Sequence, residues 1–168
     1  MKLSFTYLIL LLVTLATNAR GTTVVPPTFD QLVDEAEVIF QGKVTAVRSQ
    51  WAGEGAQRVI VTFITFSVED SMKGNPGQSY TIRMLGGTVD GETIEIADAP
   101  KFNVGDREVL FVEHNGSQFI PLVGIMHGRF HVKRDQVGGE SVTTNEGEVL
   151  TGLSEFKAAI RQKIQRAR

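Results

Sequence analysis

The chain has 168 residues, with 17 basic and 19 acidic side chains, no cysteine and a formal net charge of −2. This length can form one hydrophobic core but hardly two. The acidic balance argues against nucleic-acid binding, and the absence of cysteine excludes disulfides and a cysteine-linked lipid anchor.

The first 21 residues have the three-part layout of a secretory signal peptide: Lys2, an apolar stretch over 7–16, and small or polar residues through Gly21. Cleavage after Ala19 and cleavage after Gly21 both satisfy the small-residue rule. The stretch is about half of the roughly 20 residues that a membrane helix needs, which favours a cleaved leader over an uncleaved anchor. Without the leader the chain keeps 15 basic and 19 acidic residues, a net charge of −4. We expect a secreted or periplasmic protein without stable membrane insertion.

A short helix is predicted after an extended lead-in that ends in Pro26 and Pro27. Thr28 can cap this helix, and Gln31 can complete a capping box. Together with the apolar stripe that follows, these signals predict a helix over residues 29–35.

Three strands are predicted next. Apolar alternation marks residues 37–47, and residues 58–70 alternate on both faces, as in a barrel strand. Between them, Trp51 and the glycine-rich run 52–57 make a turn. The third strand, 80–85, stops at a Gly-Gly pair.

A type I′ hairpin is predicted at Asn115-Gly116, because an Asn-Gly pair between apolar runs is the usual sequence of this turn. It would pair Val112 with Phe119. Before it, Asp90-Gly91 is predicted to form a tight turn that leads to a short strand over residues 93–96.

The last quarter of the chain is predicted to hold a final strand over 129–133, a polar loop over 135–152 and a helix over 153–168 capped by Ser154. The far face of this helix is basic. Basic side chains near the C-terminus of a helix interact favourably with the helix dipole, which explains a solvated basic end. The alternative is that this face contacts a membrane or an acidic partner. The basic residues are Lys157, Arg161, Lys163, Arg166 and Arg168.

No residue set has the pattern of a metal site. His127 and His131 have a spacing that binds zinc on a helix, but their surroundings predict a strand, in which the rings would lie about 13 Å apart. His114 flanks a predicted turn.

No catalytic centre is predicted either. One acidic segment could supply an acid and a base, although turn residues that promote solubility explain it better. No nucleophile motif is present. We therefore expect no catalytic residue, metal or cofactor. The acidic residues are Asp90, Glu92, Glu95 and Asp98.

Two segments carry a resemblance: FDQLVDEAEVIFQGKV at 29–44 and VEDSMKG at 68–74. With the Val-Pro-Pro lead-in at 25–27, they resemble the netrin-like module of the tissue inhibitors of metalloproteinases, over about residues 22–85. The chain also looks like a broad group of exported bacterial proteins with the same strand order. The resemblance implies a barrel of the oligonucleotide/oligosaccharide-binding (OB) type.

One departure concerns the N-terminus. The inhibitors chelate the protease zinc through an N-terminal cysteine that a disulfide holds, and this chain has no cysteine. In the Val-Pro-Pro register Thr22 takes that place, and Thr23 takes the place of the residue directed at the protease specificity pocket.

The predicted fold is all-β: one domain with a five- or six-stranded OB-like barrel over 22–134, a short N-terminal helix and a C-terminal helix. The leading function is a non-catalytic exported protein-binding module whose partner is a protein such as a zinc protease. Trp51 is either a binding anchor or a cover over the barrel mouth. A structural or carbohydrate-binding envelope protein is the alternative, and an enzyme ranks third. The predicted partner-binding residues are Thr22, Thr23, Val24 and Trp51.

Overall fold

The computed structural model describes residues 26–135 and 138–167 of the chain. The predicted signal peptide and the predicted binding residues Thr22, Thr23 and Val24 lie outside this part. No helix within it is both long and apolar enough to cross a bilayer.

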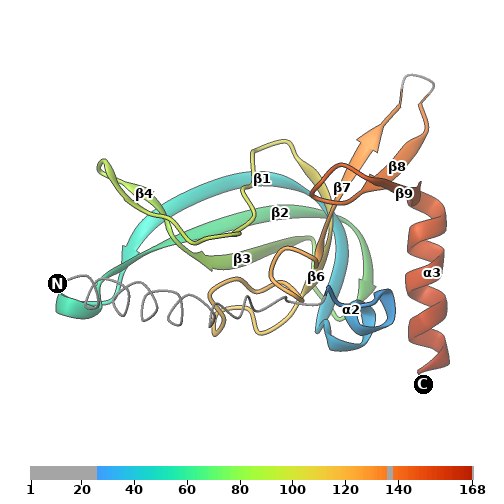
Figure 1. The fold of residues 1–168 in the computed structure, drawn as a ribbon, viewed down its shortest axis with the longest axis horizontal. Helices are drawn as coiled ribbons and strands as arrows, with labels where there is room; N and C mark the ends of the chain where they lie inside the picture. The colour runs from blue at the N-terminus through green and yellow to red at the C-terminus, as the bar shows by residue number, and fades with distance from the viewer. Residues whose placement is uncertain (1–25, 136–137, 168) are drawn as a thin grey trace, which may run out of the picture.

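Strands hold more of the described residues than helices do (Figure 1). Seven strands form one antiparallel sheet in the order β3-β2-β1-β6-β7-β8-β9, and β4 pairs with β5 in a separate hairpin. The elements are α2 (Phe29–Glu35), β1 (Val38–Ala52), the 3₁₀-helix η2 (Gly55–Gln57), β2 (Val59–Lys73), β3 (Ser79–Leu85), β4 (Gly87–Val89), β5 (Glu92–Ile94), β6 (Arg107–Val112), β7 (Arg129–Arg134), β8 (Glu140–Thr143), β9 (Val149–Gly152) and α3 (Leu153–Arg166).

The mostly β fold with a short helix near its start and a C-terminal helix is confirmed. The main sheet has seven strands rather than five or six, because β8 and β9 lie in the stretch 135–152 that was expected to be a loop. Within the described residues β3 and β9 end the strand order, and no pairing between them closes the sheet. Barrel closure therefore stays a prediction.

The two helices begin differently. The capping box of α2 is confirmed: the Gln31 backbone N–H donates to Thr28 Oγ1 at 3.3 Å, and the Thr28 N–H donates to Gln31 Oε1 at 2.8 Å. The predicted Ser154 cap of α3 is wrong. Because β9 runs directly into α3, the extended residue Gly152 takes the N-cap position without a side-chain cap, and Ser154 falls within the first turn.

The type I′ turn lies at Asp90-Gly91, where φ is +52° and +84° and the flanking residues pair in β4 and β5. The prediction at Asn115-Gly116 is wrong. Gly116 has a positive φ but Asn115 does not, and Val112 bridges to Leu122 rather than pairing with Phe119.

Asn115 instead covers the outer edge of β3. Its side-chain Oδ1 accepts from the Arg83 N–H at 3.0 Å, and its Nδ2 donates to the Thr81 carbonyl at 2.8 Å. The amide thus takes the place of a neighbouring strand, which satisfies backbone groups that an edge strand otherwise leaves open.

Two hydrophobic cores meet at β6, whose side chains are buried on both faces of the sheet. Val109 and Phe111 belong to the core under α2 and α3, whereas Leu110 and Val112 belong to the core between β1, β2 and β3. The central strand is therefore shared by both cores.

The basic face of α3 contacts the domain rather than solvent alone. Lys157 and Arg161 both pair with Asp70 of β2, at 2.8 and 2.7 Å. Lys163 pairs with Asp30 and Asp34 of α2. These three side chains hold α3 in place, so the prediction of a fully solvated face is wrong for them.

Candidate functional site

A loop with unusual backbone geometry lies where the N-terminal lead-in enters the domain. Pro27 packs on Gly124 so closely that a Cβ there would lie 2.8 Å from Pro27 Cγ. The next residue, Ile125, has a φ of +65° and a residue exposure of 48%. A β-branched residue in this conformation is strained by about 1–3 kcal/mol. An exposed apolar side chain held in such a loop is a candidate for contact with a partner.

Three open hollows, with volumes of about 240, 560 and 780 Å³, follow one another beginning beside this loop. Pro27 and His127 line the first, and Met126 lines the second. The first and second share the lining residues Arg129, Thr144 and Asn145. The second and third share Asp106, His131 and Lys133. Neighbouring hollows thus share lining residues, and the three hollows together, from Pro27 to Lys43, are here named the concave surface.

A buried ion pair lies at the centre of the concave surface. Glu108 is fully buried and Arg129 is 5% exposed. Arg129 Nη2 donates to Glu108 Oε1 at 2.8 Å, while Nη1 donates to the Lys101 carbonyl at 2.8 Å. The guanidinium carbon lies 4.1 Å from the centroid of the Phe102 ring. Because burial of a single ion is costly, each charge depends on the other.

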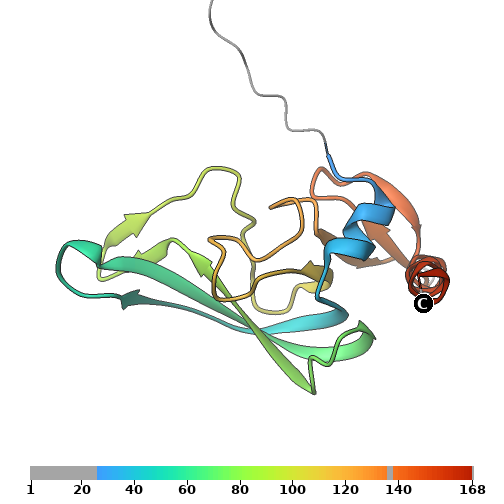
Figure 2. The same cartoon turned by 90° about the horizontal axis from the view of Figure 1, so that it is seen from below.

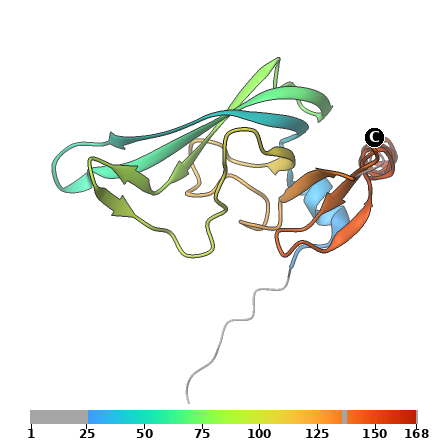
Figure 3. The ribbon, with the colours of Figure 1, turned by 90° about the horizontal axis from the view of Figure 1, so that it is seen from above.

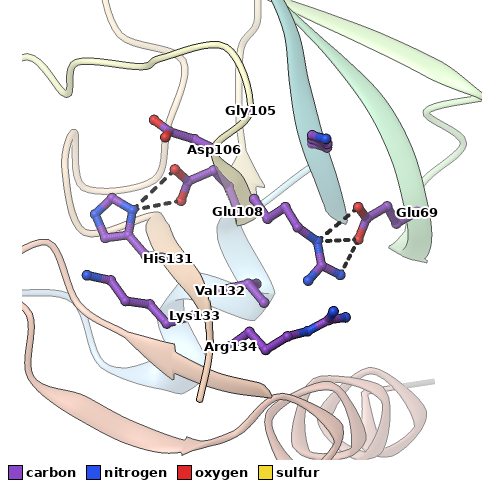
Figure 4. A pocket seen from close by; sticks show the side chains of 10 residues that line it. Glu69, Gly105, Asp106, Glu108, His131, Val132, Lys133 and Arg134 are labelled. Atoms are coloured by element: carbon purple, nitrogen blue, oxygen red, sulfur yellow. Dashed lines mark hydrogen bonds and ion pairs between the residues drawn. The ribbon is translucent and has the colours of Figure 1, made fainter. Parts of the chain in front are cut away.

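His131 extends this pair toward the third hollow (Figure 4). It faces Glu108 across the β6–β7 ladder, and its Nδ1 lies 3.2 and 3.1 Å from Glu108 Oε1 and Oε2. The carboxylate favours the proton on Nδ1, so Nε2 is the nitrogen that a ligand can use. His127 lines the first hollow instead.

The far wall of the third hollow is charged. Arg107 donates to Glu69 and Glu140, and these hydrogen bonds raise the pKa of Arg107. The Arg107 hydrogen bond likewise lowers the pKa of Glu140. Among the described residues, Lys43 and Lys133 line the same hollow without an ion-pair partner. This end of the surface thus offers two unpaired ammonium groups.

The β8 residue that pairs with His131 is buried. Thr143 pairs with His131 across β7 and β8, but it is 3% exposed and its hydroxyl lacks a hydrogen-bond partner, so a substrate cannot reach it. Over residues 26–135 and 138–167, no group of three or more histidine, aspartate or glutamate side chains could hold a metal ion.

Trp51 lies elsewhere, at the far end of the β1–β2 hairpin. It belongs to β1 rather than to a turn, it pairs with Ile60, and Arg58 stacks 4.0 Å from its ring centroid. Figures 1, 2 and 3 place this hairpin end opposite α2, the helix that follows the N-terminal lead-in. The structure therefore places Trp51 at the other end of the molecule from α2, while Thr22, Thr23 and Val24 lie outside the described residues.

Sequence reasoning missed the concave surface because its lining comes from β1, β2, β6, β7 and the loops around 100, 126 and 145. A signal did exist. Glu108 and Arg129 each stand at the start of an apolar run predicted to be a strand, and a charged residue in such a run indicates a buried pair.

The fold and this surface define a protein with one seven-stranded antiparallel sheet and a concave surface around a buried ion pair. No protein-family model, curated protein or solved structure matches the chain.

Proposed function

We propose that the chain is an exported, non-catalytic protein-binding module and that the concave surface holds its partner. One observation carries the proposal: the three hollows share lining residues in sequence, and their lining changes from apolar at one end to charged at the other. The apolar end includes Phe29, Leu150 and Phe156, and the charged end includes Lys43 and Lys133. An apolar patch beside charged side chains offers a partner both kinds of contact that protein interfaces use.

The N-terminal segment belongs to the same proposal. Pro27 lines the apolar hollow, so the residues before it join the domain at this end of the concave surface. Thr22, Thr23 and Val24 would extend the binding surface, and a zinc protease is the partner class that the resemblance to the metalloproteinase inhibitors implies. The proposal also includes an OB-like curvature of the sheet.

The surface is tested by substitution. Leu150→Asp places a charge in the apolar hollow, which Leu150 lines with an exposure of 44%. Phe119→Asp is its matched control, because Phe119 is 69% exposed and lies outside the three hollows. A protein retained from the extracellular fraction by the unchanged chain should bind Leu150→Asp at least tenfold more weakly and Phe119→Asp equally well. Equal retention by both variants would contradict the proposed surface.

The partner class is tested by the N-terminus. A free terminal amine has a pKa near 8 and readily ligates zinc once deprotonated. A protein that begins at Thr22 should inhibit zinc proteases, and one with a single additional residue before Thr22 should not. Inhibition by neither form removes the inhibitor function, and equal inhibition by both removes the chelation mechanism.

A further inference from the structure

A fourth cavity, of about 380 Å³, lies between the β1–β2–β3 face and the β4–β5 hairpin. It shares only the segment 99–101 with the second hollow, and its other lining residues belong to none of the three hollows. The cavity is therefore distinct from the proposed protein-binding surface, and we name it the hairpin pocket.

The floor of the hairpin pocket is one face of the sheet. Val47 and Ser49 of β1 pair with Ile64 and Thr62 of β2, and all four line the pocket. Because strand side chains alternate between faces, Trp51 lies on this same face of β1, two residues beyond Ser49. The floor thus leads from apolar side chains to the chain's single tryptophan.

The roof is supported at its β4 end by a close backbone approach. Gly87 lies directly over the floor, where a Cβ would lie 2.3 Å from Thr62 Oγ1 and 2.4 Å from Ser49 Oγ. Thr62 Oγ1 also donates to the Gly86 carbonyl at 2.6 Å. Only glycine permits this contact.

A second support holds the other end of the roof. Arg129 donates to the Lys101 carbonyl and stacks on Phe102, and Arg129 is itself fixed by buried Glu108. With both ends held, the segment between them spans the sheet face instead of collapsing onto it. These contacts therefore keep the space between the roof and the sheet face open.

We infer that the hairpin pocket binds a small uncharged apolar ligand, such as a medium-length acyl chain or a fused aromatic ring. Its volume falls at the small end of the roughly 300–1,000 Å³ that ligand pockets span. The lining is mainly apolar, and a narrow space between two layers suits a thin, flat or linear molecule. The apolar side chains include Val47, Ile64, Met84, Ile94, Ile96 and Phe102.

The polar groups of the pocket favour an uncharged ligand. A hydroxyl has one proton, and that of Thr62 goes to the Gly86 carbonyl, so Ser49 must donate its own proton to Thr62 across 2.9 Å. Neither hydroxyl has a proton left for an anion. The other two lining hydroxyls, of Thr88 and Thr93, bond to each other at 2.9 Å and belong to solvent-exposed residues. The charges of Lys101 and Glu95 neutralise each other at 3.0 Å and are largely exposed.

The test uses N-phenyl-1-naphthylamine, an uncharged probe that fluoresces in apolar surroundings, with the purified exported protein. Saturable binding of one probe per chain, with energy transfer from Trp51, is expected. Val47→Asp places a charge on the floor and should weaken binding at least tenfold. Val149→Asp, on β9 at the other end of the sheet and 64% exposed, should change it less than twofold.

Two results would overturn the inference: absence of saturable one-to-one binding by the unchanged protein, or equal loss of affinity in Val47→Asp and Val149→Asp. Circular dichroism checks that each variant folds. If Val47→Asp does not fold, Ala99→Phe replaces it, because a ring at this half-buried lining position fills the pocket without adding charge. Full probe affinity in Ala99→Phe would then reject the pocket.

Discussion

Removal of one charge from the buried Glu108–Arg129 pair should cause a large loss of stability. In Glu108→Leu the Arg129 guanidinium keeps its bond to the Lys101 carbonyl and a longer contact of 3.6 Å with the partly exposed Asp106, but it loses its fully buried counter-charge. Breaking a buried pair in this way costs about 3–5 kcal/mol. Since about 1 kcal/mol shifts the melting temperature of a domain of this size by roughly 2–4 °C, the shift should be about 6–20 °C.

The double variant Glu108→Leu/Arg129→Met separates charge burial from packing. Removal of both charges abolishes the uncompensated ion, and the remaining loss is the hydrogen bond to the Lys101 carbonyl, worth about 1–2 kcal/mol. Urea unfolding should therefore find the double variant more stable than Glu108→Leu. A free energy of unfolding of Glu108→Leu within 1 kcal/mol of that of the unchanged protein would refute the argument, and so would a double variant that is less stable than Glu108→Leu.

Three further predictions concern single contacts. Asn115→Ala removes both side-chain hydrogen bonds to the edge strand β3 and should lower the free energy of unfolding by about 1–2 kcal/mol in urea. Burial would raise the pKa of Asp70, but hydrogen bonds from two α3 cations outweigh it and lower this pKa. The stabilisation by Asp70 is therefore complete above the unfolded pKa of about 3.9 and is lost as the pH falls through the folded pKa. In Asp70→Asn the free energy of unfolding should consequently fall less steeply as the solution is acidified. Gly87→Ala should displace the β4–β5 hairpin and lower the melting temperature, whereas Gly91→Ala, with open space around its Cβ, serves as a control for the positive φ alone.

Local signals predicted the first half of the fold well. The capping box at Thr28 and Gln31 depends on residues three apart, and the first three strands alternate over long runs. Such patterns depend only on residues within one helix or strand, so the sequence alone predicts these elements.

Turn chemistry was less decisive. Asp90-Gly91 and Asn115-Gly116 both match a type I′ turn, and only the first forms one. Asn115 instead pairs with β3, more than 30 residues away in sequence, and no local pattern encodes such a contact. Likewise β8 and β9 are short and polar, and they are strands because β7 offers a free edge.

The concave surface depends on long-range packing even more strongly. Glu108 and Arg129 are 21 residues apart, and their pairing follows from the β6–β7 register rather than from any motif. The prediction for Trp51, a binding anchor or a cover over the barrel mouth, rested on its residue type and on the glycine-rich run beside it, and neither says to which end of the sheet the strand brings the side chain.

The double burial of β6 has a consequence for how the protein opens. Val109 and Phe111 are held by one core, and Leu110 and Val112 by the other, so neither core can separate from the sheet without exposing this strand. Fluctuations that release β3 or β9 at the sheet ends leave β6 covered. Its amide protons should therefore exchange with solvent only through global unfolding, and the two cores should melt as one cooperative unit.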